Sequence, residues 1–204
     1  MATSTNRRQR SDGLRSRQTI LRAAASLATV DGLEGISIGN LAAHIGMSKS
    51  GLYAHFGSKE ELQLATVETA EEIFDAEVVA PTTSIADPLE RLQGLAESFI
   101  AHLERRVFPG GCFFASVETE FDTHPGPVKD RIAAIQQGWS RLLQRLIAEA
   151  QAAGQLTADG NPVQLAFELD SYLLMGNTLF VLHDAPAYLQ QARAAIARRL
   201  DRAR

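Results

Sequence analysis

The stretch from Ser37 to Leu62 holds the polar side chains of this chain that are best placed to bind another molecule. It contains two short helical patterns on either side of Gly46, and each begins at a serine whose hydroxyl can accept a hydrogen bond from a free backbone N–H. Apolar residues at helical spacing give each pattern a buried side, so the polar residues of the second pattern face away from the core. Two short helices joined by a tight glycine turn are typical of the helix-turn-helix motif, whose second helix lies in the major groove of DNA.

The polar residues of this stretch are assigned to two kinds of DNA contact. Lys49 and Ser50 lie early in the second short helix, so we expect them to reach base edges. A second group is expected to bind phosphate oxygens, because hydroxyls, lysine and helix N-termini suit that contact. This group consists of Ser37, Ser48, Tyr53, His55 and Lys59. For Tyr53 the alternative is a half-buried packing role, and the same alternative holds for His55.

The first 13 residues show no hydrophobic period and are predicted to form a flexible basic arm. Arg7, Arg8 and Arg10 could enter the adjacent minor groove of a bound duplex, with a disordered polar tail as the alternative. Residues 14–60 are then predicted to form the DNA-binding domain, and residues 61–204 a larger helical domain.

The charges of the two parts differ in sign. Residues 1–60 carry 8 basic and 4 acidic side chains, or +4, and the remaining residues carry 12 basic and 20 acidic ones, or −8. Phosphate attraction acts locally, so the overall net charge of −4 does not argue against DNA binding.

Helical patterns without a convincing strand fill the rest of the chain, which predicts an all-α fold of about nine helices. Capping signals at Ser58 and Asp87-Pro88 begin two of these helices. Alternating steps of four and three residues from Val128 to Leu146 mark a long amphipathic one. With 204 residues and 45% hydrophobic content, the chain can bury a sizeable core.

The first part of the chain resembles the TetR family of transcriptional regulators. The resemblance covers Leu14 to Leu64 and is carried by Ile38, Leu41-Ala42, Gly46-Met47-Ser48, Leu52-Tyr53, His55-Phe56 and Ser58-Lys59-x-x-Leu62. It implies a three-helix DNA-binding domain, a backbone-anchoring role for Lys59, and a helical second domain that surrounds a ligand pocket. It also implies a homodimer in which the last two helices form a four-helix bundle with a partner. Small residues would allow close approach there, namely Ala166, Gly176, Ala192, Ala195 and Ala197. The alternative for each of them is that these helices simply complete the core of the monomer.

The dimer also follows from the physics of DNA recognition. A single short helix touches few base pairs, and non-specific phosphate binding has a Kd of about 10⁻⁴ to 10⁻⁶ M, so useful selectivity requires two heads on a palindrome.

A ligand pocket is predicted from inward-facing positions of the second domain. The candidates are Phe99, His102, Cys112, Phe114, Glu118, Trp139, Phe167, Tyr172 and Met175. Such an apolar stripe is also what a plain core requires, but polar groups among the aromatics favour a cavity, because buried polar groups need partners. Two further polar residues, Asp170 and Asn177, could equally face solvent or an interface.

Enzymatic and metal-binding functions find little support. Glu120 and His124 are spaced by four, but Pro125 follows directly and no second metal-binding pattern completes a site. Cys112 adjoins two phenylalanines, where a thiol acts as a small apolar filler. No phosphate loop, dinucleotide fingerprint or Gly-x-Ser-x-Gly elbow occurs. We therefore expect no enzyme activity, no cofactor and no metal.

Membrane insertion and export are not expected either. No apolar run approaches the roughly 18 residues that cross a bilayer, and the arginine-bearing N-terminus is not followed by an apolar segment. A single cysteine agrees with a reducing compartment. We expect a cytoplasmic protein.

Together these patterns and the resemblance predict a ligand-responsive transcriptional regulator. A repressor is expected that binds a palindromic operator as a homodimer and is released by a small, largely apolar effector. The alternative is a helical small-molecule carrier or enzyme with a vestigial DNA-binding head.

Overall fold

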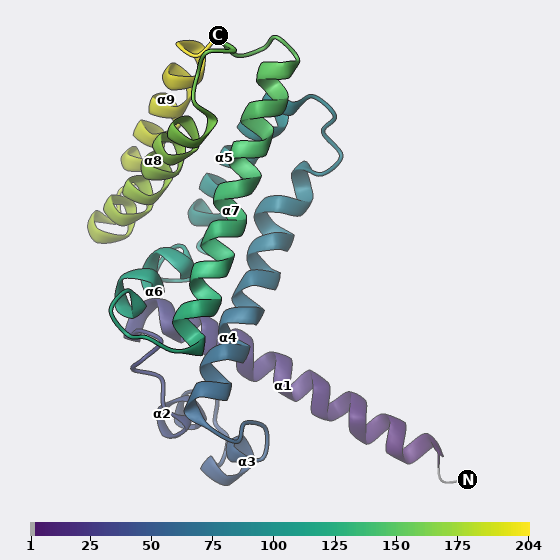
Figure 1. The fold of residues 1–204 in the computed structure, drawn as a ribbon. Coiled ribbons are helices and arrows are strands. Elements are labelled where there is room, and N and C mark those ends of the chain that lie inside the picture. Colours follow the sequence, from purple (N-terminus) through teal and green to yellow (C-terminus); the bar gives the residue numbers. More distant parts are fainter. Residues whose placement is uncertain (1–2) are drawn as a thin grey trace.

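The computed structural model describes the backbone from residue 3 to residue 204 and the side chains from Arg17 onward. Within these limits the chain is all-helical, as predicted, and contains nine α-helices and no strand (Figure 1). The helices are α1 (Thr3–Asp31), α2 (Ile38–His44), α3 (Lys49–Tyr53), α4 (Lys59–Phe74), α5 (Pro88–Glu104), α6 (Phe113–Phe121), α7 (Pro127–Ala152), α8 (Pro162–His183) and α9 (Ala187–Asp201). We call α1 to α3 together with the first turn of α4 the head, and the rest of α4 together with α5 to α9 the body.

Helix α1 begins at Thr3, so the prediction of an arm without helix is wrong for residues 3–13. Once the packed part of a helix has formed, adding residues costs little, and arginine and glutamine are good helix formers. A missing hydrophobic period therefore does not exclude a helix. Figure 1 shows this end of α1 projecting away from the rest of the chain. The side chains of Arg7, Arg8 and Arg10, which were assigned to the minor groove, lie outside the described side chains.

The head has a small core of its own. Ile20, Leu41, Leu52 and Phe56 are each at most 1% exposed. The guanidinium carbon of Arg17 lies 4.4 Å from the ring centre of Phe56, so the cation covers the outer side of this core. The three helices therefore form one packed unit that can present α3 rigidly.

Helix α4 connects the head to the body. The Ser58 hydroxyl accepts the Glu61 backbone N–H at 3.0 Å, as the capping signal predicts, while the Glu61 carboxylate accepts the backbone N–H of Gly57, one residue before the cap. At its other end α4 continues through a π-helical turn, Asp75–Val79, and a 3₁₀ turn, Ala80–Thr82. Its first turn thus lies in the head and its last turn in the body (Figure 1).

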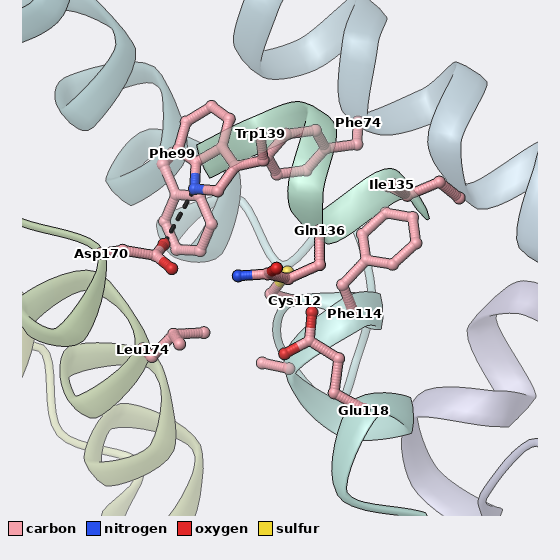
Figure 2. A pocket seen from close by; sticks show the side chains of 11 residues that line it. Phe74, Phe99, Cys112, Phe114, Glu118, Ile135, Gln136, Trp139, Asp170 and Leu174 are labelled. Carbon is pink, nitrogen blue, oxygen red and sulfur yellow. Dashed lines mark hydrogen bonds between the residues drawn. The ribbon is translucent and has the colours of Figure 1, made fainter. Parts of the chain in front are cut away.

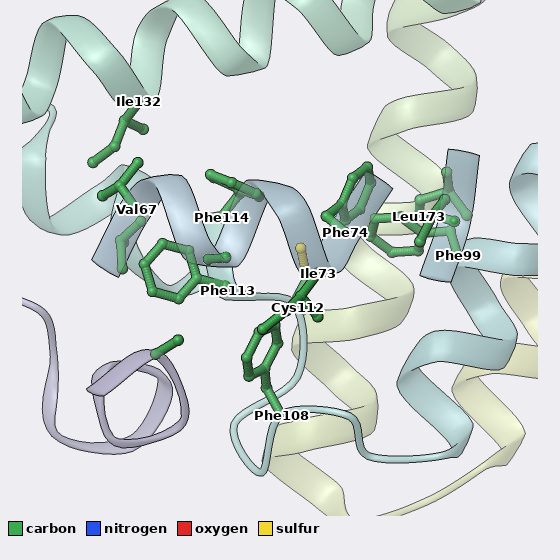
Figure 3. Close-up of a cluster of buried hydrophobic side chains, with 14 of the residues drawn as sticks. Val67, Ile73, Phe74, Phe99, Phe108, Cys112, Phe113, Phe114, Ile132 and Leu173 are labelled. Atoms are coloured by element: carbon green, nitrogen blue, oxygen red, sulfur yellow. The ribbon is translucent and has the colours of Figure 1, made fainter. Parts of the chain in front are cut away.

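The body has a core in which α4, α5, α6, α7 and α8 meet. Figure 3 shows the aromatic part of this core, with Phe74, Phe99, Phe113 and Phe114 packed around Cys112. Helices α8 and α9 pack against each other beside α5 and α7 (Figure 1). Gly176 is required there, because a Cβ on it would lie 2.8 Å from the Cβ of Ala192. Of the two roles left open for these small residues, the structure shows packing within the chain.

Candidate DNA-binding and effector sites

Helix α3 presents its polar side to solvent. Gly46 makes the preceding turn with a φ of +70°, and the Ser48 hydroxyl caps α3 by accepting the backbone N–H of Gly51 at 3.1 Å. Leu52 is buried on the inner side, whereas Lys49 and Ser50 are exposed. Of the two roles considered for Tyr53, the half-buried one is wrong, because this residue is 59% exposed.

The side chains assigned to phosphate contacts surround α3. Ser37 forms a reciprocal capping box with Asn40 at the start of α2, with its hydroxyl 3.1 Å from the Asn40 backbone nitrogen. His55 is only partly buried, and its backbone carbonyl oxygen accepts a hydrogen bond from Arg17 at 3.3 Å. All five residues of this group are at least partly exposed on the head, as are Lys49 and Ser50.

Lys59 is engaged in an ion pair on the head. Its Nζ lies 2.7 Å from a carboxylate oxygen of Glu34, whose other oxygen accepts from the Gln63 amide at 2.9 Å. The hydrogen bonds from Lys59 and then from Gln63 lower the pKa of Glu34. A phosphate group would have to compete with this carboxylate, or share Lys59 with it.

Helix α6 of the body is bound to the loop between α1 and α2. The Glu120 carboxylate accepts the backbone N–H groups of Leu33 at 2.8 Å and Glu34 at 2.7 Å, and we call this contact the Glu120 clasp. Just before α6, the backbone N–H of Gly110 donates to the Thr29 hydroxyl at 3.0 Å. Gly110 must lack a side chain, because a Cβ there would lie 1.9 Å from the Thr29 carbonyl oxygen. A shift of α6 would therefore move the end of α1 and the start of the α1–α2 loop.

On its other side α6 lines a cavity in the body, which we call the effector cavity (Figure 2). The space free of atoms amounts to about 410 Å³, part of it open to solvent, and only about 40 Å³ of it admits the centre of a water-sized molecule. Eleven residues line the cavity: Phe74, Phe99, Cys112, Phe114, Ala115, Glu118, Ile135, Gln136, Trp139, Asp170 and Leu174.

Two carboxyl groups face the effector cavity. Burial, and secondly the nearby charge of Asp170, raise the pKa of Glu118 to about 7. Burial also raises the pKa of Asp170, although the Trp139 indole N–H, which donates to it at 2.8 Å, acts in the opposite direction. No lysine, arginine or histidine is among the residues that line the cavity. The cavity therefore has mainly apolar walls that carry two acidic groups and no basic one.

Of the nine predicted pocket residues, some line the effector cavity in the structure and the others do not. Five line the effector cavity: Phe99, Cys112, Phe114, Glu118 and Trp139. His102 is 1% exposed but packs between Phe74 and Phe108 outside the lining, where burial lowers its pKa to about 4. Tyr172 is partly buried against the core and does not line the cavity.

The other two predicted pocket residues, Phe167 and Met175, do not even belong to the interior of the body. They are 68% and 57% exposed and lie on the outer side of α8, not in the cavity. A helical period defines an apolar side but does not say whether the chain itself or a partner covers it. The polar residues left open are now placed: Asp170 faces the cavity, and Asn177 is buried and accepts the Cys112 backbone N–H at 2.9 Å.

Helix α8 keeps large apolar side chains exposed along its length. Val163, Phe167, Met175 and Leu182 are each more than half exposed. By length and composition alone α8 is apolar enough to cross a membrane, and it is the one such helix in the described part of the chain, which is weak evidence because core helices pass the same test. Its two acidic residues, however, bind partners of the same chain, Glu168 with Arg199 and Asp170 with Trp139. These contacts are those of a helix that packs against its own chain on one side and keeps apolar side chains exposed on the other.

The remaining reactive groups do not form a catalytic arrangement among the described residues. Burial raises the pKa of the Cys112 thiol to about 11, which keeps it protonated and weakly nucleophilic. Glu120, which the sequence paired with His124 as a possible metal ligand, binds the head instead, and the His124 ring nitrogen contacts the Glu120 carbonyl oxygen at 2.8 Å. No group of three or more potential metal ligands occurs in the part that the structure describes.

The fold and this site define a helix-turn-helix head joined to a helical ligand-binding body, and comparisons with known proteins agree. Residues 20–66 match the family model of bacterial regulatory proteins of the tetR family, and residues 88–196 match the tetracycline-repressor-like C-terminal domain. Because the second match alone covers more than half of the chain, this chain belongs to the TetR family of transcriptional regulators.

Individual relatives are more distant. The transcriptional regulator AcuR of Cereibacter sphaeroides is 26% identical over 157 residues, which is 76% of this chain and 71% of that protein. A TetR regulator from Chloroflexus aurantiacus has the same fold, with a TM-score of 0.85, 24% identity and coverage of 92% and 94%. AibR, solved with isovaleryl coenzyme A and operator DNA, gives a TM-score of 0.71 at 25% identity, with coverage of 88% and 95%.

Proposed function

We propose that this regulator is a repressor that binds a palindromic operator as a homodimer and leaves it when a small, largely apolar effector enters the effector cavity. The observation that carries the proposal is the position of α6, which lines that cavity with Phe114 and Glu118 and holds the head through the Glu120 clasp. AibR, which was solved with both an acyl coenzyme A and operator DNA, supports a response to a small molecule.

In the operator-bound form, the exposed side of α3 would lie in the major groove with Lys49 and Ser50 on base edges. The side chains from Ser37 to Lys59 that were named above would bind phosphates, and Arg7, Arg8 and Arg10 would bind the same duplex. Exposure of Lys49, Ser50 and Tyr53 on one side of the head supports this arrangement.

A dimer supplies the second head. The exposed apolar side of α8, with Phe167 and Met175, is the surface we propose for the partner, because exposed apolar surface of this extent favours association. Helix α9 would complete the four-helix bundle. The acidic body and basic head are consistent with a protein that acts in the cytoplasm, where its DNA lies.

Release would follow from movement of two elements that reach both sites. Helix α4 brings Phe74 to the cavity and Lys59 to the head, and α6 does the same with Glu118 and Glu120. An effector that displaces either helix would change the separation of the two α3 helices and so weaken operator binding. Such coupling is reciprocal, so the operator must lower effector affinity by the same factor.

Footprinting on the DNA upstream of the protein's own gene tests the proposal. We expect a protected site with two-fold symmetry and half-sites about one helical turn apart. If no duplex is protected even at low salt, the head is vestigial and a carrier or enzyme function takes the place of this proposal. Equal operator affinity with and without every bound small molecule would refute the switch alone.

A further inference from the structure

We propose that the effector cavity binds a small organic cation, an amine or quaternary ammonium group on an apolar body, with its charge between Glu118 and Asp170. This inference rests on the proposed function, because it takes this cavity as the effector site. The proposed function requires only that a small molecule bind there. The residues that line the cavity and its free space indicate, in addition, the charge and the size of that molecule.

The polar groups of the effector cavity leave two acceptors without partners. Glu118 has no hydrogen bond or ion pair with any described residue, although it extends into the space shown in Figure 2. Asp170 uses one oxygen to accept the Trp139 N–H, and its second oxygen has no partner among the described side chains. Both residues are only partly buried, and their free oxygens point toward the cavity, where a donor on a ligand could reach them.

The sign of the charge follows from what surrounds these carboxyls. The polar neighbours in the lining are the neutral Gln136 and Cys112. The basic residue of the adjacent surface groove, Lys129, donates to the backbone carbonyl of Asp122. Two acidic groups with no lining cation disfavour an anionic ligand and favour a cationic one.

The walls of the cavity suit the same kind of ligand. Phe74, Phe99, Phe114 and Trp139 line it, with the Phe74 and Trp139 ring centres 5.3 Å apart. Aromatic faces carry partial negative charge and attract cations, most strongly where water is excluded, and this is how quaternary ammonium groups are recognised in proteins. A carboxylate at the end of an aromatic cavity combines both attractions.

The free space limits the size of the ligand. The free space of about 410 Å³, part of which is open to solvent, suits a compact amine on an apolar body. A long ligand such as an acyl coenzyme A would have to leave most of its atoms outside this space.

The test uses the full-length dimer and three probes of similar shape: 2-phenylethylammonium, 2-phenylethanol and 3-phenylpropanoate. Trp139 is the single tryptophan of the chain and lies on the cavity wall, so its fluorescence reports binding directly. At pH 7.5 we expect the ammonium probe to bind at least tenfold more tightly than the alcohol, and the carboxylate to bind least.

Glu118→Gln should raise the Kd of the ammonium probe at least fivefold and change the Kd of the alcohol less than twofold. We expect the same changes for Asp170→Asn. Glu118 has no partner to lose, so its variant keeps the test valid if Asp170→Asn does not fold. Glu72→Gln is the matched control, because it makes the same change at an exposed side chain of α4 and should alter nothing.

Equal or tighter binding of the alcohol or the carboxylate, or no fluorescence response to any probe, would overturn the inference. The two proposals can fail separately. A footprint together with a preference for the carboxylate would keep the regulator and reject the cation. A preference for the ammonium probe without any footprint would reject the regulator and keep the binding site.

Discussion

Replacing Glu120 with glutamine tests the connection between the body and the head. The carboxylate accepts two backbone N–H groups, those of Leu33 and Glu34, and glutamine offers a single acceptor oxygen and loses the charge. A hydrogen bond to a charged group contributes about 1.5–3 kcal/mol, and the partial exposure of Glu120 places this one near the lower limit. We therefore expect the loop to lose about 1.5–2 kcal/mol of local stability.

Native-state hydrogen exchange measures this loss at the two amides. A change of 1.4 kcal/mol corresponds to a factor of ten, so the amides of Leu33 and Glu34 should exchange roughly 10 to 30 times faster in Glu120→Gln. Amides of α5 and α7 should keep their protection, and Glu72→Gln should leave all rates unchanged. Unaltered protection at Leu33 and Glu34 would show that the clasp does not hold the loop.

The same variant also tests the route of the switch. If effector binding reaches the head through α6, Glu120→Gln should reduce the ratio between operator affinity without and with effector, while affinity for the effector itself stays the same. Gly32→Ala should reduce the same ratio, because a Cβ on residue 32 would lie 2.7 Å from a Glu120 carboxylate oxygen. The alanine would also have to adopt the positive φ of 79° that glycine has there. An unchanged ratio in both variants would locate the coupling elsewhere.

Further predictions concern the head, the interface and the buried groups. Lys49→Ala should relax the preference at one base position per half-site by about 1–3 kcal/mol, whereas Lys59→Ala should weaken all duplexes alike and flatten the salt slope, as binding titrations on cognate and scrambled DNA would show. Phe167→Glu should yield monomers in sedimentation equilibrium, because it places a charge on the apolar side of α8; retained dimers would contradict that interface. Because the folded state raises the pKa of Glu118 from 4.5 to about 7, folded protein binds this proton more tightly than unfolded protein, and stability should fall as pH rises between these values. Glu118→Gln should remove this fall and stabilise the protein at pH 8 by about 1–2 kcal/mol, allowing for solvent screening, as urea unfolding at several pH values would show. Cys112 should resist a thiol reagent at pH 8 in the folded protein and react on unfolding, because burial raises its pKa to about 11.

The head was largely predictable because its determinants are local. The caps at Ser37 and Ser48, the turn at Gly46 and the buried Leu52 are all within sixteen residues of one another, and the structure has each of them in its predicted place. The exception is the N-terminal extension of α1. The residues there show no hydrophobic period, so the sequence pattern alone predicts an arm where the backbone is helical.

The body was predictable only in its helices. Helical period identifies an apolar side, but the neighbour of that side is set by tertiary packing, so Phe167 and Met175 were assigned to a cavity although they are exposed. Phe74 also lines the cavity, and its helical spacing from Val67 and Ala70 marks it as an inward-facing residue of α4. No sequence pattern indicates the contact of Glu120 with the head, because its partners on the loop are 86 and 87 residues away in the sequence.

The central claim, that two copies of α3 recognise one duplex, is tested most directly by an equilibrium titration at about 0.15 M salt. Three fluorescent duplexes are compared: the footprinted site, one half-site and a scrambled sequence. We predict two protomers on the full site, with affinity at least about 10³-fold above the scrambled duplex, and much weaker binding to the half-site. Equal affinity for all three duplexes, or one protomer on the full site, would contradict the account.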